Sequence, residues 1–180
     1  GLLSSLLDTY FPNESPDFWM LQGYCNLYFN LYTAAYANFE KVLKSDSDNE
    51  MALRGMARTA FMMEDYDDAE DLFKRLRDLR PSKRYYQLYY CLSLMKTDQI
   101  EDALGELYKL NYERPDDADV DRALAWSLLL SGKSEQAYSK YEKLLSIPNP
   151  LDDDYLNAGY CQWILGKIEN ALSLFRKYKD

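Results

Sequence analysis

Two arginines four residues apart, Arg54 and Arg58, carry the clearest potential for chemistry in this chain of 180 residues. At that spacing two side chains share one face of a helix, where like charges disfavour the helix slightly. A shared anionic group on a ligand would offset this repulsion, because a guanidinium binds a carboxylate in a bidentate fork. The pair therefore predicts recognition of an acidic or C-terminal group.

Catalytic and metal-binding chemistry have little support in the sequence. The chain contains no histidine, which removes the commonest general base and the usual zinc ligand. Acidic clusters at residues 65–68 and 152–154 stand at predicted helix starts, where carboxylates complement the positive helix end. They lack the spacing and the turn glycine of a calcium loop. We therefore expect no enzyme activity, no cofactor and no metal site.

Composition restricts the classes of partner. With 21 basic and 30 acidic residues the net charge is −9, which argues against nucleic acid as a ligand. No apolar run reaches membrane-spanning length, and no signal peptide is visible, so we expect no membrane contact by this chain. The three cysteines, Cys25, Cys91 and Cys161, form no pair signature and are expected to fill the core. These features favour a cytoplasmic location.

A strict repeat supplies the elements that position the arginines. Five alanines recur every 34 residues, at Ala35, Ala69, Ala103, Ala137 and Ala171. Large apolar residues follow each alanine at i+4 and i+7, which is the pattern of one helical face. Prolines or a polar turn then interrupt the pattern, as at Pro81 and Pro115. A second helix is predicted upstream of each alanine, and Gly132 and Gly166 are expected to take the left-handed conformation that ends it.

This arrangement resembles the tetratricopeptide repeat family, whose pattern combines Trp, a small residue, Ala, Phe and Pro at fixed positions. The first repeat matches at Trp19, Gly23, Ala35 and Phe39. The second matches at Ala57, Ala69, Phe73 and Pro81. The resemblance covers essentially the whole chain and implies an all-α, right-handed superhelical solenoid of antiparallel helix pairs.

The repeat phase divides the chain into one continuous domain of five units. We expect these at residues 16–49, 50–83, 84–117, 118–151 and 152–180. Residues 1–15 are interpreted as the second helix of a preceding, truncated repeat. Because no polar capping helix follows the fifth unit, we interpret the chain as a segment of a longer array.

The resemblance also implies which residues bind a partner, because first helices of such repeats line the concave groove. Aromatic and Met side chains would supply contact area, and Arg54, Arg58 and Arg122 would orient an acidic group. The predicted groove residues are Met20, Tyr24, Tyr28, Arg54, Arg58, Phe61, Met62, Tyr85, Met95, Arg122, Trp126, Tyr160 and Trp163. From the same face, Leu27, Leu88, Leu129 and Ile164 are expected to be core residues instead.

The predicted function is a non-enzymatic interaction scaffold that captures a peptide or helix from an unidentified protein. A structural spacer, or a segment that self-associates end to end, is the alternative. A segment of the same protein could also fill the groove. A type III secretion-type chaperone is less favoured, because nothing singles out a cargo pocket. Chaperone-cofactor domains of this family hold a C-terminal carboxylate with Lys and Asn at recurring inner positions. The first of the matching positions here are Met20 and Tyr24, so this carboxylate clamp is absent.

Overall fold

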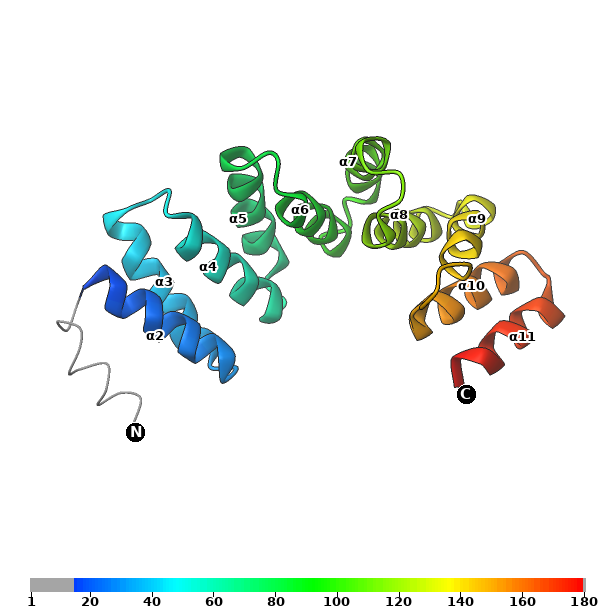
Figure 1. Ribbon diagram of the computed structural model, residues 1–180, viewed down its shortest axis with the longest axis horizontal. Helices are drawn as coiled ribbons and strands as arrows, with labels where there is room; N and C mark the ends of the chain where they lie inside the picture. Colours follow the sequence, from blue (N-terminus) through cyan, green and yellow to red (C-terminus); the bar gives the residue numbers. More distant parts are fainter. Residues whose placement is uncertain (1–14, 180) are drawn as a thin grey trace. The chain divides into compact units, whose positions relative to one another are not determined.

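The computed structural model describes residues 15–179, which form ten α-helices and no strand (Figure 1). The predicted all-α class is confirmed. Residues 1–14, interpreted above as part of an earlier repeat, lie outside the described residues. In chain order the helices are α2 (Pro16–Tyr28), α3 (Tyr32–Ser45), α4 (Glu50–Met62), α5 (Tyr66–Leu79), α6 (Arg84–Lys96), α7 (Ile100–Glu113), α8 (Ala118–Leu130), α9 (Ser134–Leu144), α10 (Asp152–Ile164) and α11 (Ile168–Lys179).

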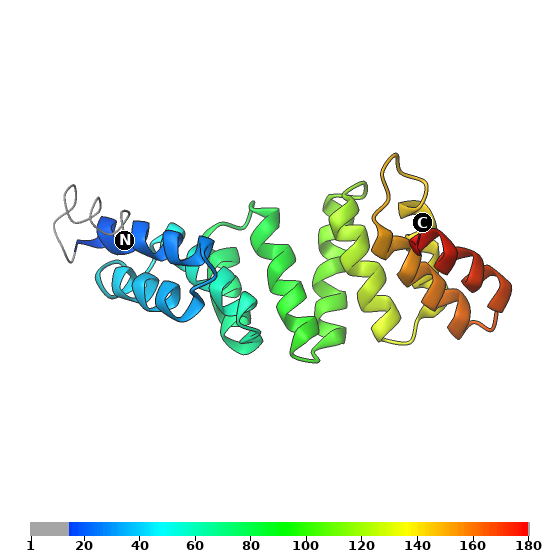
Figure 2. The same cartoon turned by 90° about the horizontal axis from the view of Figure 1, so that it is seen from below.

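The chain divides into two compact units, the first ending at Ser93 and the second beginning at Leu94. In the first unit α2 packs on α3, α3 on α4, and α4 on α5. In the second unit the same succession runs from α7 through α11. The pairs α2–α3 and α10–α11 are antiparallel hairpins in both views (Figure 2). The single continuous superhelix expected over residues 16–180 stays a prediction.

Side-chain caps fix where several helices begin. Ser15 and Asn49 precede α2 and α4, and each side-chain oxygen accepts a hydrogen bond from a backbone N–H three residues later. Asp117 caps α8 in the same way, through the N–H groups of Asp119 and Val120. These bonds satisfy amide groups that have no partner within the helix. The sequence therefore encodes the helix starts locally.

The turn inside every helix pair passes through a left-handed residue, again with a 34-residue period. Gly132 and Gly166 have φ values of 77° and 74°, which confirms the expectation for these two glycines. Asn30, Glu64 and Asp98 take the same conformation with φ between 58° and 63°. Asn and Asp enter this region more readily than other non-glycine residues, so among these described turns the hairpin geometry overrides local preference chiefly at Glu64.

The repeated alanines and the apolar residues that follow them form the core. All five alanines are at most 2% exposed. Phe39 is fully buried between two glycines, Gly23 on α2 and Gly55 on α4. A Cβ atom added at Gly23 would lie 2.7 Å from the Phe39 ring, and one added at Gly55 would overlap the ring. The glycines therefore allow both helices to pack directly on the aromatic ring.

Two glycine-to-alanine substitutions should change stability in opposite directions. Gly55→Ala is expected to lower the free energy of unfolding by about 1 kcal/mol or more, because crowding outweighs the gain in helix propensity. Gly105→Ala on α7 should raise the free energy by about 0.5–1 kcal/mol, since nothing lies within 4 Å of the new methyl group. Urea denaturation followed by circular dichroism measures both. If Gly55→Ala and Gly105→Ala changed the free energy of unfolding equally, the close packing of Gly55 on Phe39 would be contradicted.

Candidate anion-binding hollow on the first helices

Four side chains from three first helices line an open hollow in the first unit. Tyr24 comes from α2, Arg54 and Arg58 from α4, and Tyr85 from α6. The hollow has a volume of about 370 Å³, enough for one or two side chains of a ligand. We call these four residues the arginine hollow. All four were predicted as groove residues from the sequence, and the structure brings them together.

The amphipathic character of α4 places both arginines on the surface. Its residues Leu53, Met56 and Ala57 are buried against neighbouring helices, whereas Arg54 and Arg58 are exposed on the opposite face. The buried side of the helix is rich in alanine, which lets the helices on either side approach closely. The sequence of α4 therefore fixes the direction in which both guanidinium groups point.

Tyr24 holds Arg54 at the edge of the hollow. The Tyr24 hydroxyl donates a hydrogen bond to the Met51 carbonyl oxygen at 2.8 Å and accepts from Arg54 Nε and Nη2 at 3.4 Å. The Arg54 guanidinium also lies 5.9 Å from the centre of the Tyr24 ring. The hydrogen bond with Tyr24 raises the pKa of Arg54 above its ordinary value. Arg54 is thus oriented by a neutral partner and keeps its full charge.

The charge of both arginines is uncompensated locally. Within residues 15–179 no carboxylate forms an ion pair with Arg54 or Arg58. The nearby acid Glu50 accepts hydrogen bonds from Tyr86 and Arg80 instead, each at 2.8 Å. The hydrogen bond from Tyr86 lowers the pKa of Glu50, so this carboxylate remains ionised. It is already paired with Tyr86 and Arg80. In a chain with a net charge of −9, the arginine hollow is a local concentration of positive charge.

Tyr85 closes the other side of the hollow. Its ring is 4.4 Å from that of Tyr89 and 6.1 Å from that of Phe73, so an aromatic cluster fixes its position. Burial raises the pKa of Tyr85 to about 12, while the guanidinium of Arg58 acts in the opposite direction. The hydroxyl group therefore stays protonated at neutral pH and can donate to an anionic ligand.

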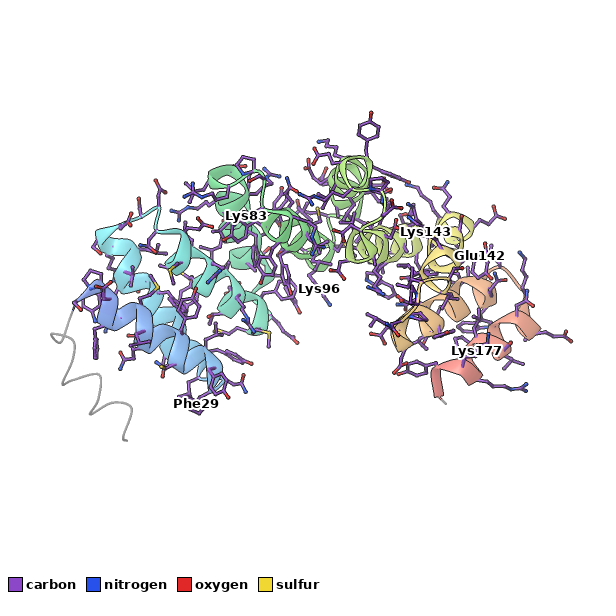
Figure 3. All side chains as sticks on the ribbon, in the orientation of Figure 1. Phe29, Lys83, Lys96, Glu142, Lys143 and Lys177 are labelled. Carbon is purple, nitrogen blue, oxygen red and sulfur yellow. The ribbon has the colours of Figure 1, made fainter. Side chains whose placement is uncertain are left out.

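Other predicted groove residues of the first unit have different environments. Tyr28 and Met62 are exposed, at 80% and 50%, near the ends of α2 and α4. Met20 and Phe61 are partly buried against the core, and Phe61 lies edge-on to Tyr66, Phe73 and Tyr89. Phe29, which follows α2, is 56% exposed and points away from the helices, although it was not predicted (Figure 3).

Two residues that were predicted to line the groove are not available to a ligand. Met95 is only 8% exposed, because its side chain packs in the core. Arg122 on α8 already forms a bidentate ion pair with Asp154 of α10, at 2.9 Å and 3.0 Å. Asp154 is 1% exposed, so Arg122 compensates a buried charge. The hydrogen bonds to Asp154 raise the pKa of Arg122.

The second unit exposes apolar side chains on α10 and α11. Tyr160 and Trp163 are 39% and 57% exposed, and Trp126 on α8 is 38% exposed. Leu27 and Leu88 are buried and Leu129 is partly buried, in line with their expected core role, but Ile164 is 61% exposed and is not a core residue. Leu172 on α11, one of the apolar residues that the sequence offers for end-to-end self-association, is 48% exposed. Ile168 on the same helix is 49% exposed and was not predicted; its apolar type in a second helix was the available signal.

None of the three cysteines is in a disulfide bond. Cys91 and Cys161 are buried in the core, and Cys25 is partly buried. Burial raises the pKa of the Cys161 thiol to about 11, which keeps it protonated and unreactive at neutral pH.

Sequence and structure comparisons agree on the fold. The pattern of the tetratricopeptide repeat (TPR) family matches residues 27–89. The crystal structure of MamA protein superposes with a TM-score of 0.77 over 91% of this chain and 89% of that chain, at 21% identity. This chain has the TPR fold.

Two further TPR structures support this assignment. MamA 41-end from Desulfovibrio magneticus RS-1 has a TM-score of 0.81 at 16% identity, over 93% of this chain and 94% of that chain. YrrB, described as a TPR protein with an unusual peptide-binding site, has a TM-score of 0.72 at 20% identity, over 93% and 86%. No curated protein matches the sequence. None of the ten described helices has the length and apolar character needed to cross a membrane.

Proposed function

We propose that this TPR chain is a protein-interaction module that binds an acidic peptide segment at the arginine hollow. The TPR fold generally serves as a non-enzymatic scaffold for protein partners, and YrrB is described as having a peptide-binding site. The observation that carries the proposal is that the guanidinium groups of Arg54 and Arg58 line one hollow and that neither has a carboxylate partner within residues 15–179.

A carboxylate fits this hollow for electrostatic and geometric reasons. Two arginines on adjacent turns of α4 repel each other, and one anionic group between them would relieve that repulsion. Arg54 is held in place by Tyr24, whereas Arg58 forms no hydrogen bond or ion pair with its side chain within residues 15–179. A ligand carboxylate can therefore pair with Arg58 in a bidentate fork and accept from Arg54.

The aromatic walls add apolar contact beside the charge. Tyr24 packs edge-on against Phe39 at 5.0 Å, and Tyr85 packs against Tyr89, so both rings are held rigidly. Rigid tyrosines provide contact area with little loss of conformational entropy. A peptide with an acidic side chain or a C-terminal carboxylate next to an apolar residue would therefore bind best.

Peptide selection on the purified chain tests this proposal. A random peptide display library should yield binders enriched in Asp, Glu or a free C-terminus. The double variant Arg54→Gln, Arg58→Gln should bind the selected peptides about 100-fold more weakly, because it removes two charged hydrogen-bonding groups. Fluorescence polarisation at low and high salt measures the affinity, and high salt should weaken wild-type binding.

A matched variant separates local recognition from net charge. Lys74→Gln, Arg75→Gln changes the charge by the same amount on the exposed face of α5. It should alter peptide affinity by less than about threefold, because long-range charge effects are screened. Selected peptides without acidic groups, or equal losses in both double variants, would contradict the proposal.

A further inference from the structure

The arginine hollow carries two positive charges that no carboxylate of the described chain balances. Arg54 and Arg58 stand on adjacent turns of α4, which brings their side chains onto one face of the helix. The one acid of α4, Glu50, is paired with Arg80 and Tyr86 instead. A ligand with one negative charge would therefore neutralise only one of the two guanidinium groups, whereas a dianion would neutralise both.

The two guanidinium groups also offer more hydrogen-bond donors than a carboxylate can engage with ideal geometry. Arg58 keeps all of its N–H donors, because its side chain forms no hydrogen bond within residues 15–179. Arg54 uses Nε and Nη2 on the Tyr24 hydroxyl and keeps its Nη1 group. A bidentate pair with Arg58 engages both oxygens of a carboxylate. A phosphate monoester has three acceptor oxygens, so the third can accept from Arg54.

The walls of the hollow are aromatic. Tyr24 lines one side, from α2, and Tyr85 the other, from α6. Both rings are fixed by aromatic neighbours, with ring centres 5.0 Å and 4.4 Å from those of Phe39 and Tyr89. The volume of about 370 Å³ is larger than a phosphate group fills by itself. A ligand ring beside these tyrosines would add apolar contact, so the lining favours an aromatic side chain that carries the anion.

The two positive charges act on the same point of the hollow. Burial raises the pKa of Tyr85 to about 12, whereas the guanidinium groups of Arg58 and Arg54 both act in the opposite direction. Both groups are thus close enough to the Tyr85 hydroxyl to influence its charge. Their fields overlap beside Tyr85, where an anion with two charges is stabilised most.

We propose that the arginine hollow binds a phosphotyrosine side chain of a partner protein. The phosphate dianion pairs with Arg58 and accepts from Arg54, while the ring lies between Tyr24 and Tyr85. The site is the one proposed above for an acidic peptide, so this inference rests on that function and names the acidic group. Because an unmodified tyrosine offers no anion, phosphorylation of the partner would control the interaction.

Peptide pools that differ only in their central residue test this preference. Each pool contains rhodamine-labelled, acetylated and amidated heptapeptides whose other positions are randomised over Ala, Gly, Leu, Ser and Gln. The central residue is phosphotyrosine, sulfotyrosine, phosphoserine, glutamate or tyrosine. In fluorescence polarisation with the intact chain, the phosphotyrosine pool should bind at least about tenfold more tightly than the glutamate pool, because it adds a charged hydrogen-bonding pair.

Two of the pools separate the second charge from the ring. Sulfotyrosine has the ring and three terminal oxygens of phosphotyrosine but a single negative charge, and it should bind at least about fivefold more weakly. Phosphoserine keeps the dianion but lacks the ring, and it should bind at least about threefold more weakly than phosphotyrosine.

The pH dependence of binding distinguishes a dianion from a monoanion. The second pKa of a phosphate ester is about 6, so the dianion fraction falls about fourfold between about pH 7.5 and about pH 5.5. The affinity for the phosphotyrosine pool should fall about three- to fourfold over this range. The glutamate and sulfotyrosine pools should stay within about 1.5-fold, because their charges are already fixed.

The protein itself contributes little to this pH dependence. The chain has no histidine. The titratable side chains that line the hollow or pair with its neighbours are Tyr24 on α2, Glu50, Arg54 and Arg58 on α4, Arg80 after α5, and Tyr85 and Tyr86 on α6. Arginine and tyrosine ordinarily titrate at about pH 10 or higher, and the hydrogen bond from Tyr86 lowers the pKa of Glu50. A change in affinity near pH 6 therefore reports the phosphate.

Removing one of the two charges should remove the preference for a dianion. Arg54→Gln should weaken binding of the phosphotyrosine pool at least about tenfold and that of the glutamate pool by less than about threefold. Tyr24 stays fixed in this variant, because its hydroxyl donates to the Met51 carbonyl oxygen at 2.8 Å. The control Lys74→Gln, Arg75→Gln should keep the preference unchanged. Circular dichroism checks that the helices persist.

Failure of this inference can be told apart from failure of the proposed function. If the glutamate pool binds through Arg54 and Arg58 but phosphotyrosine binds no more tightly, the inference is overturned and the acidic-peptide function stands. If neither pool binds, both are overturned. An unchanged preference in Arg54→Gln, or equal binding of phosphoserine and phosphotyrosine, would also contradict the assignment of a phosphotyrosine to this hollow.

Discussion

Replacing Phe39 by alanine should lower the free energy of unfolding of the first unit by about 3–5 kcal/mol. The ring is fully buried between Gly23 and Gly55 and lies edge-on to Tyr24. Both glycines lack side chains that could move into the space, so a cavity remains after truncation. Urea denaturation followed by circular dichroism measures the loss.

Hydrogen exchange shows where the loss occurs. Because each repeat contacts mainly its neighbours, protection should fall in α2, α3 and α4 and persist in α10 and α11. Tyr112→Ala is the control, since this tyrosine is 89% exposed and its removal should change stability by less than about 0.5 kcal/mol. A loss in Phe39→Ala no larger than in the control would contradict the packing described for the first unit.

Asp121→Asn should destabilise the second unit by about 3 kcal/mol at neutral pH. The Asp121 carboxylate is 1% exposed and accepts hydrogen bonds from Asn111 at 3.0 Å and from Lys140 and Lys143 at 2.9 Å. Lys143 lies on α9, at the place labelled in Figure 3. The substitution leaves two ammonium groups facing an amide that cannot balance their charge.

The same carboxylate makes stability depend on pH. Burial tends to raise the pKa of Asp121, but the hydrogen bonds from Lys143 and Lys140 outweigh burial and lower it. A lowered pKa in the folded state contributes stability above the unfolded value of about 4, and that contribution is lost as the pH falls further. The difference between Asp121→Asn and wild type should therefore shrink between about pH 5 and pH 2.

A surface ion pair provides the comparison for Asp121. Glu101 lies 3.4 Å from Lys133 with a side chain that is 74% exposed. Glu101→Gln should change the free energy of unfolding by no more than about 0.5 kcal/mol at any pH, because water and salt screen the pair. Equal effects of the two substitutions in urea denaturation would show that Asp121 is not held as described.

The fold could be predicted because its signals are local and recur. Alanine every 34 residues marks the close packing of helices, and caps such as Asn49 mark helix starts. The left-handed turn was predicted only at Gly132 and Gly166. Asn30 is of a type that tolerates that conformation, whereas at Glu64 the residue type argues against it and only the period of the chain indicates it.

The site could be predicted only in part, because side-chain partners come from other helices. Spacing alone brought Arg54 and Arg58 onto one face of α4. Arg122 has the same type and a similar position, but its partner Asp154 lies on α10, 32 residues later, and no local pattern indicates that pair. Ile168 was missed because the family resemblance directs attention to first helices.

The common left-handed turn has a consequence for how such a chain can change in evolution. Because all five hairpins turn through the same backbone conformation, with turn residues 34 positions apart, the units are equivalent in outline. Duplication or loss of 34 codons would insert or remove a whole unit and restore the same turn on both sides. An insertion of one or two residues within a helix would instead rotate its buried face relative to its neighbours. The gene can therefore vary in length by recombination in steps of one repeat.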